Sequence, residues 1–274
     1  MDKIISNKIK KRETSSSFLK NRINLNKKFQ KSNFTSWQLQ TYRNIFKKLL
    51  KTKKSSTKIL DVGAGDGLQV SYFLKIFKNP EIWCLDYSKK SLKSLSQKYK
   101  HKNIKIIHKN MDNLDDLIKK KKLKRYFDIA HSSYALYYAK NPKLVLKSMK
   151  TSLSDGGLFL VSAPSEPHEM VNFINKVYKI PAKILKTLKF YKNILIPFLK
   201  QNGKNTILIK KINYLNFQRG SDFLNFWKNT TYYNVTAKDI ILKKLNKRKS
   251  LKFKKISSIH ALYFFSNSSS SMID

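Results

Sequence analysis

The sequence predicts an α/β protein built on a doubly wound, mostly parallel sheet. Two observations predict it. Short apolar segments alternate with helical segments across residues 57–163 at the spacing of βαβ units. The first apolar segment breaks into Gly63, Gly65 and Gly67, as expected where a strand turns sharply into a helix. Because such crossovers are right-handed, helices should cover both faces of the sheet.

Each element follows from its own pattern. Apolar positions at helical spacing predict a first helix near Trp37, capped by Thr35 or Ser36. Strands are expected, in order, at residues 58–62, 81–86, 103–110, 125–133 and 158–165. The helices between them are expected at residues 68–77, 89–99, 112–124 and 141–153, and Asp155-Gly156-Gly157 should end the last of these. Beyond Pro164 the pattern predicts helical structure over 167–200, a strand at 205–217, a helix at 221–230 and a long strand at 250–265.

The charge is the most unusual global property. The chain of 274 residues carries 58 Lys and Arg against 16 Asp and Glu, a formal net charge of +42. A surplus this large attracts anionic partners, and non-specific nucleic-acid affinity is one expectation. However, few of these residues are arginine, and lysines spread along the whole chain, with runs at 47–54, 119–124 and 243–255. Selected nucleic-acid binding and a bias of AT-rich coding toward Lys, Asn and Ile both remain open.

Other compositional features exclude several classes. With Cys84 alone, the chain forms no intramolecular disulfide and no Cys-rich zinc site. No His and carboxylate cluster suggests a metal, so none is predicted. No apolar stretch reaches the length of about 18 residues that a membrane span requires. We expect a cytoplasmic protein, with an organelle transit peptide as the weaker alternative.

The glycine segment Ile59–Gly67 reads ILDVGAGDG and carries the chemical signal. Its spacing is G-x-G-x-G, and Leu68 stands where a dinucleotide fingerprint has its third glycine. Asp61 precedes Gly63 by two residues. A carboxylate there suits an ammonium group better than a pyrophosphate. No Gly-Lys-Ser/Thr follows, so the segment is not a P-loop.

An acid followed by G-x-G-x-G after the first strand resembles the class I (Rossmann-like) S-adenosylmethionine-dependent methyltransferases, over residues 57–163. The resemblance implies a seven-stranded sheet, a helical lid insert after strand five, and S-adenosylmethionine as cofactor. It implies that Asp61 lies near the methionine amino group. It also implies that the backbone of Gly63, Ala64 and Gly65 lines the cofactor. Asp86, at the end of strand two, would accept both ribose hydroxyls, and Tyr87 would pack on the adenine.

After strand three the family often has an acid that accepts from the adenine amino group. Here the alignment places Asn110 at that position and Met111 beside the ring, with Asp112 as the competing candidate. A helix cap and a core contact are the alternative roles for these residues. The fourth motif falls on His131-Ser132-Ser133-Tyr134. His131 is the best single candidate for cofactor or acceptor contact and for a general base, or else a histidine satisfied by hydrogen bonds beside the cofactor. His168, after strand five, is a weaker candidate.

The resemblance also divides the chain. Residues 1–34 are a basic extension, mobile or partly helical, that could serve as part of a lid. Residues 35–265 form the methyltransferase domain, with a cofactor half at 57–163 and an acceptor side at 165–265. Residues 266–274 are expected to be a disordered tail. Candidate acceptor-pocket residues are Tyr134, Trp227 and Tyr232, with ordinary core packing as their alternative role.

The predicted function is methyl transfer to a nitrogen or oxygen of a small molecule. One alternative is an RNA methyltransferase acting on rRNA or tRNA, which the net charge favours. The fourth motif disfavours it, because it is not the Asn/Asp-Pro-Pro-aromatic sequence of exocyclic base amine methylation. The other alternative is a non-catalytic binding protein that keeps the fold as a scaffold.

Overall fold

The computed structural model describes residues 16–30, 34–52, 57–100, 102–165, 169–182, 184–185, 189–203 and 206–264. The expected tail at 266–274 lies outside these ranges. So do residues 1–15 and 31–33 of the expected extension. The chain forms two compact units. We call Trp37–Ala163, Phe190–Ile209 and Ser258–Asp274 the sheet unit. We call Met1–Ser36, Pro164–Lys189 and Lys210–Ser257 the second unit.

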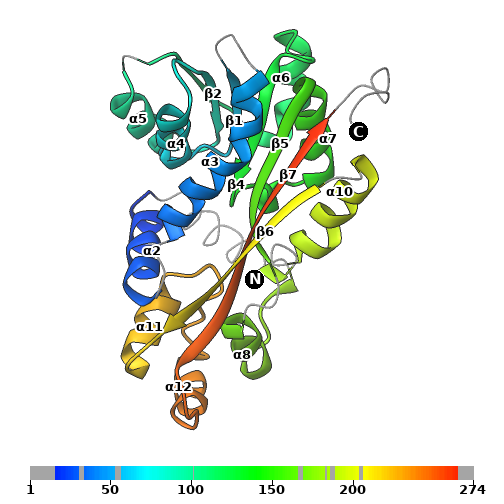
Figure 1. Ribbon diagram of the computed structural model, residues 1–274. Coiled ribbons are helices and arrows are strands. Elements are labelled where there is room, and N and C mark those ends of the chain that lie inside the picture. Colours follow the sequence, from blue (N-terminus) through cyan, green and yellow to red (C-terminus); the bar gives the residue numbers. More distant parts are fainter. Residues whose placement is uncertain are drawn as a thin grey trace. The chain divides into compact units, whose positions relative to one another are not determined.

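A seven-stranded sheet has the order β3-β2-β1-β4-β5-β7-β6 (Figure 1). Its strands are β1 (Lys58–Val62), β2 (Glu81–Asp86), β3 (Ile104–His108), β4 (Phe127–Ser133), β5 (Leu153–Ser165), β6 (Thr206–Asn216) and β7 (Lys252–Phe264). The pairs β1–β2, β1–β4, β2–β3 and β4–β5 are parallel. The predicted fold class is therefore confirmed. The strand order reverses between β1 and β4, where open α/β sheets bind their ligands.

Helices in the sheet unit form two layers on the two faces. Helices α3 (Phe34–Thr52), α4 (Leu68–Ile76) and α5 (Lys89–Lys98) share one apolar cluster with Ile59 and Ile82. Helices α6 (Leu114–Lys120), α7 (Pro142–Ser152) and α10 (Ile196–Asn202) share the other with Leu60 and Leu85. Alternation along β1 thus places Asp61 on the α3 and α4 side of the sheet, with Ile59.

Shorter helical turns complete the sheet unit. They are η1 (Met111–Asn113), η2 (Leu136–Tyr138) and the π-helical η3 (Tyr191–Leu195). Helix η1 follows β3 and η2 follows β4, so both occur at the carboxyl ends of parallel strands.

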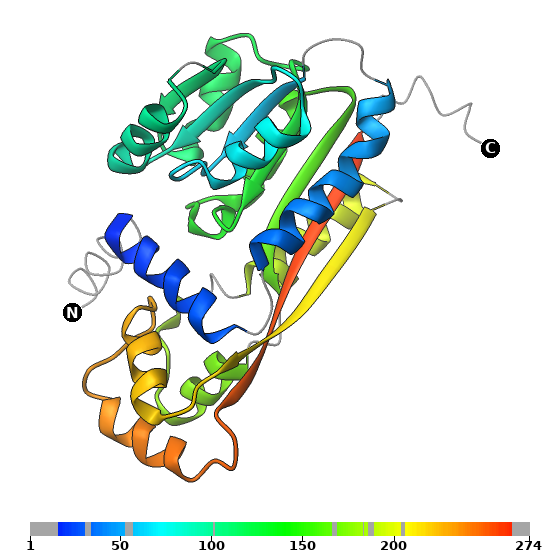
Figure 2. The same ribbon diagram turned by 60° about the vertical axis from the view of Figure 1, so that its left-hand side comes forward.

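The second unit has its own core. It contains α2 (Ser16–Phe29), α8 (Glu169–Val177), α11 (Gly220–Lys228) and α12 (Lys238–Asn246). Phe29 of α2 packs edge-on against Phe226 of α11, with 6.2 Å between ring centroids. Phe223, Trp227 and Phe253 are wholly buried in the same cluster. Strands β6 and β7, neighbours in the sheet, run side by side over a long, twisted course (Figure 2).

Three elements differ from the sequence prediction. Strand β5 begins at Leu153 and runs through Gly156 and Gly157, where the sequence predicts only a stop. The register with β4 passes from Phe127–Leu153 to Ile129–Leu158, so residues 154–157 form an irregularity in β5, and Gly156 there has left-handed backbone (φ +69°). Helix α12 is not predicted: it spans nine residues, and Ala237 before it offers no capping side chain. Helix α3 begins at Phe34, ahead of the expected cap.

The described residues contain neither a candidate membrane span nor a candidate metal site. No described helix is long and apolar enough to cross a membrane. In the same part of the chain, no three His, Cys, Asp or Glu side chains gather in a way that would hold a metal ion.

Candidate active site

The candidate site lies where β1 and β2 end. Gly63, Gly65 and Gly67 all have left-handed backbone, with φ of +77°, +57° and +85°. They differ in what surrounds them. A Cβ on Gly63 would stand 2.2 Å from the Cβ of Ala135, and one on Gly67 would stand 2.9 Å from Leu95 and Tyr99. A Cβ on Gly65 would meet nothing within 4 Å. Gly65 is therefore the loop glycine whose backbone faces open space.

The amide groups of this loop are already used within the protein. Gly63 and Ala64 both donate to the carbonyl of Leu85, at 2.8 and 3.1 Å. Gly65 donates to Asp86 Oδ2 at 2.8 Å, and Gly67 donates to the carbonyl of Ala64 at 3.1 Å. A loop that cradles a pyrophosphate needs such groups free for the ligand. These four amides are therefore not free for a pyrophosphate, which agrees with the glycine spacing.

Asp86, the last residue of β2, accepts a hydrogen bond from the glycine loop. Its Oδ2 accepts from Gly65 and its Oδ1 accepts from the amide of Ser88 at 2.7 Å. A carboxylate offers about four lone-pair sites, so acceptor capacity remains for a ligand beside the amide donors. Burial raises the pKa of Asp86 above its ordinary value, although hydrogen bonds from the amides of Ser88, Gly65 and Tyr87 oppose the shift. Tyr87, next along the chain, is 48 % exposed.

Asp61 is buried, and only one of its two carboxylate oxygens has a hydrogen-bond partner among the described residues. Its Oδ1 lies 2.8 Å from His131 Nδ1. Within the part of the chain that the structure describes, Asp61 Oδ2 is buried and has no hydrogen-bond partner. Leaving a buried acceptor unsatisfied costs about 1–3 kcal/mol, more for a charged group. Such an atom next to the glycine loop points to a ligand that donates to it.

His131 lies inside the protein. It is wholly buried, and its Nε2 lies 2.7 Å from the hydroxyl of Tyr42. Both ring nitrogens are thus used, one by Asp61 and one by Tyr42. A general base needs a nitrogen that reaches the acceptor's proton. The structure therefore gives no support to the base role, and agrees with the alternative of a hydrogen-bonded histidine. His168, a weaker sequence candidate, lies outside the described residues.

The polar side chains of the segment after β3 are used in hydrogen bonds to nearby backbone amides. Asn110 Oδ1 accepts from the amide of Asp112 at 3.0 Å and so caps η1. Asp112 Oδ1 accepts from the amide of Asn141 at 3.1 Å. Met111 does reach the glycine loop: its Cε is 3.7 Å from where a Cβ on Gly63 would stand. Of these three candidates, Met111 is the one that the structure places against the loop.

The acceptor-pocket candidates fall in different units. Tyr134 follows β4 with a left-handed backbone (φ +55°), and its amide donates to the carbonyl of Ser162 at 2.9 Å. Trp227 is wholly buried in the second unit and donates from Nε1 to the carbonyl of Tyr232 at 3.2 Å. Trp227 and Tyr232 thus have a packing role there, and acceptor contact by any of the three stays a prediction.

Sequence reasoning missed three polar residues that the structure brings to His131. Tyr42, Gln38 and Ser162 join it in one hydrogen-bonded cluster. One signal was available: Gln38 and Tyr42 stand four residues apart among apolar positions of one helix. Polar side chains on a buried helical face need partners, and the nearest strands supply them.

Comparisons with known proteins identify the family. The model described as "Methyltransferase domain" matches residues 33–239. The chain belongs to this methyltransferase family. The resemblance to class I S-adenosylmethionine-dependent methyltransferases is thereby confirmed, and with it the cofactor class.

Solved structures agree on the fold of this methyltransferase. The YcgJ protein from Bacillus subtilis superposes with a TM-score of 0.59 at 14 % identity, covering 83 % of this chain and 98 % of its own. A protein from Bacillus halodurans, crystallised as a candidate methyltransferase, has a TM-score of 0.55 at 14 % identity, covering 80 % and 98 %. No curated protein matches the sequence.

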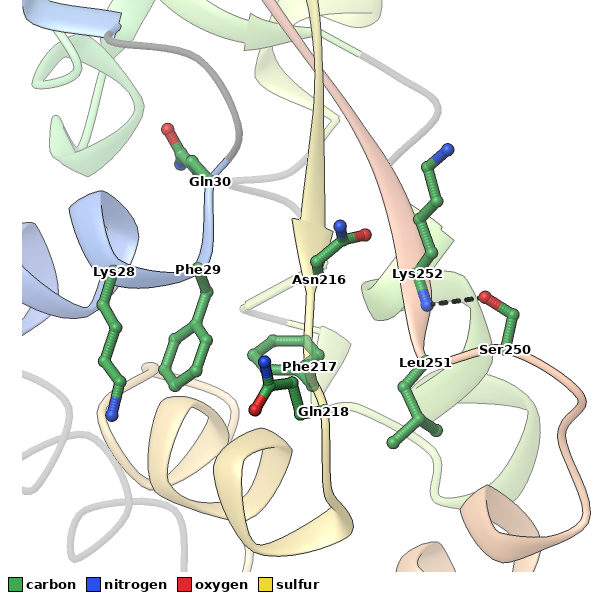
Figure 3. Close-up of a pocket in the computed structure, with 9 residues that line it drawn as sticks. All are labelled: Lys28, Phe29, Gln30, Asn216, Phe217, Gln218, Ser250, Leu251 and Lys252. Atoms are coloured by element: carbon green, nitrogen blue, oxygen red, sulfur yellow. Dashed lines mark hydrogen bonds between the residues drawn. The ribbon is translucent and has the colours of Figure 1, made fainter.

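A hollow of about 520 Å³ lies in the second unit (Figure 3). It is lined by the end of α2 and by residues 216–218 and 250–252. Gln30 on its wall already bonds Asn26 and Asn213, and the ammonium group of Lys252 lies 4.1 Å from the ring of Tyr214. Among the described residues that line it, none is an acid or a histidine. The hollow thus contains none of the residues proposed to hold the cofactor.

Proposed function

We propose that this methyltransferase binds S-adenosylmethionine at the carboxyl ends of β1 and β2 and methylates a nitrogen or oxygen of a small molecule. The observation that carries the proposal is the buried, unpartnered Oδ2 of Asp61 beside the glycine loop. The ammonium of the methionine part of the cofactor supplies the donor that this oxygen lacks, directly or across one bridging water.

The other residues at this edge fit the same ligand. Asp86 has acceptor capacity left for the vicinal ribose hydroxyls. The open space beside Gly65 lets the ligand approach the backbone. Met111, beside Gly63, and the half-exposed Tyr87 would pack against the adenine.

The cofactor supplies a methyl group bound to a positively charged sulfur. The lone pair of the acceptor forms a bond to the methyl carbon as the carbon–sulfur bond breaks, its electrons pass to sulfur, and the acceptor's proton leaves. The chain contributes mainly alignment, since well-oriented systems reach effective molarities of about 10⁵–10⁸ M. Because both nitrogens of His131 are in use, we favour an amine acceptor, which loses its proton to solvent.

A matched acceptor panel tests the acceptor class. The protein is incubated with S-adenosylmethionine carrying a tritiated methyl group and with pairs of small amines and alcohols of equal carbon skeleton. We expect transfer to at least one amine and none to its alcohol partner. Transfer to the alcohols alone would contradict the nitrogen preference. Binding of S-adenosylhomocysteine without turnover across the panel would favour the non-catalytic scaffold.

A nucleic-acid acceptor is the second candidate, and one surface favours it. Residues 243–255 hold eight Lys or Arg and no acid. The side chains from Lys247 to Lys249 are exposed. Binding of this kind falls steeply with salt, because each phosphate contact releases counterions. RNA added to the same panel would favour this candidate if it were methylated in preference to every small molecule.

Cofactor affinity should depend on pH through Asp86. The ionised carboxylate accepts the ribose hydroxyls, and protonation removes acceptor capacity. Because burial raises the pKa of Asp86 above its ordinary value, affinity for S-adenosylhomocysteine should fall, on acidification, at a higher pH than an unshifted carboxyl would give. Titrations across this range measure the effect. Asp86→Asn should bind more weakly and lose this pH dependence, whereas an equal dependence in both proteins would exclude Asp86 as its source.

A further inference from the structure

We propose that Tyr42 and His131 form a buried relay that positions Asp61 for the ammonium of the cofactor. Helix α3, which precedes the first strand, is then a functional part of the cofactor site. This inference rests on the proposed function, and it assigns positioning roles to Tyr42 and His131.

The relay is continuous and closed to solvent. Asp61 Oδ1 lies 2.8 Å from His131 Nδ1, and His131 Nε2 lies 2.7 Å from the hydroxyl of Tyr42. Asp61 is 1 % exposed, and His131 and Tyr42 are 0 % exposed. Asp61 and His131 are partners in the parallel register of β1 and β4, so the sheet itself fixes their spacing.

The hydrogen-bond directions follow from the groups present. An ionised carboxylate only accepts, so Nδ1 of His131 donates to Asp61. In a neutral imidazole the other nitrogen then accepts, and the Tyr42 hydroxyl donates to it. Burial raises the pKa of Tyr42 far above its ordinary value, so this hydroxyl keeps its proton.

The far end of the relay is anchored on two elements. The oxygen of Tyr42 lies 3.2 Å from Gln38 Nε2, one helical turn earlier, and 3.0 Å from Ser162 Oγ on β5. Gln38 also donates to Ser133 Oγ at 3.1 Å. Phe73 packs edge-on against the His131 ring at 5.2 Å between centroids. These contacts hold the imidazole ring in one orientation.

Positioning follows from this arrangement. The relay occupies Oδ1 of Asp61 and leaves Oδ2 as the acceptor without a partner among the described residues. Without the Tyr42 hydroxyl, Nε2 of His131 loses its donor, and the ring can adopt the tautomer that carries its proton on Nε2. The lone pair of Nδ1 would then face the carboxylate, and Asp61 would turn away from its present orientation.

The test compares Tyr42→Phe with Tyr263→Phe. The hydroxyl of Tyr263 donates to the carbonyl of Ile45 at 3.1 Å, so this control removes one hydroxyl contact with the same helix but outside the relay. Each protein is titrated with S-adenosylhomocysteine and with 5′-methylthioadenosine, which lacks the amino-acid part. We expect Tyr42→Phe to bind S-adenosylhomocysteine about tenfold more weakly, with its affinity for methylthioadenosine unchanged, and Tyr263→Phe to match the wild type for both ligands.

Two results would overturn the relay. Equal weakening of both ligands in Tyr42→Phe would indicate a structural role, and no weakening of either would remove the positioning role. Failure of the proposed function looks different, because the wild type itself would then bind neither ligand.

A measurement on the wild type covers the case in which Tyr42→Phe does not fold. Nitrogen-15 NMR of labelled histidine, with His131→Gln used to assign the His131 signal, should show a neutral ring that carries its proton on Nδ1. A proton on Nε2 alone would contradict the relay.

Discussion

Gly63→Ala should lower the melting temperature by about 10 °C. A residue other than glycine at φ +77° is strained by about 1–3 kcal/mol. The new methyl group would also stand 2.2 Å from the Cβ of Ala135, and overpacking of this kind costs about 1–3 kcal/mol or more. About 4 kcal/mol in total corresponds to this shift, at about 2–4 °C per kcal/mol for domains of 150–250 residues. Thermal melting followed by circular dichroism measures it.

Gly65→Ala is the matched control in the same loop. Its φ of +57° gives a similar strain, but a Cβ there meets nothing within 4 Å. We expect a smaller loss of stability and a clear loss of cofactor affinity, because the methyl group enters space proposed for the ligand. The double variant Gly63→Ala/Ala135→Gly should regain part of the stability that Gly63→Ala loses. Equal melting temperatures for Gly63→Ala and Gly65→Ala would contradict the packing explanation.

Asp86→Ala should weaken binding of S-adenosylhomocysteine at least tenfold. The variant removes the acceptor proposed for two ribose hydroxyls, and hydrogen bonds to charged groups contribute about 1.5–3 kcal/mol each. A loss of 1.4 kcal/mol is already a factor of about ten. The variant also frees the amide of Gly65, which loosens the loop on the ligand side. Calorimetric titration measures the affinity.

Asp66→Ala separates a specific contact from a loss of charge. Asp66 lies in the same glycine loop, but its carboxylate pairs with Lys98 of α5 at 3.1 Å. Both variants remove one negative charge from the same region of the protein. We expect Asp66→Ala to bind within about twofold of the wild type, since exposed ion pairs contribute about 0–1 kcal/mol. Equal weakening by both variants would indicate electrostatics of the region rather than recognition of the ribose.

The positions of the central strands and of the glycine loop along the chain could be predicted because local patterns determine them. Alternating apolar and helical segments gave the central strands, and the spacing around Gly63 and Gly65 gave the sharp turn after β1. Asp61 and Asp86 followed because they stand at fixed places relative to predicted strands. The start of β5 at Leu153 could not be predicted, because Leu153 pairs with Phe127 of β4, which lies far from it in the sequence, and residues 154–157 have no partner in that register.

The surroundings of His131 depend on contacts distant in sequence. Its partner Tyr42 lies 89 residues earlier, and Asp61 lies 70 residues earlier. A single sequence shows a histidine at the end of a strand, and a base is one reasonable interpretation of that position. Only the pairing of β1 with β4 and the packing of α3 on the same face show that both ring nitrogens are already used.

Calorimetric titration of S-adenosylhomocysteine into the wild type and into Asp86→Ala tests whether the cofactor binds at the carboxyl ends of β1 and β2. Binding with a dissociation constant on the order of 1 µM in the wild type, weakened at least tenfold in the variant, would support a cofactor site at the ends of β1 and β2. A folded wild type that binds no S-adenosylhomocysteine would contradict this cofactor site and leave the glycine loop as a structural turn.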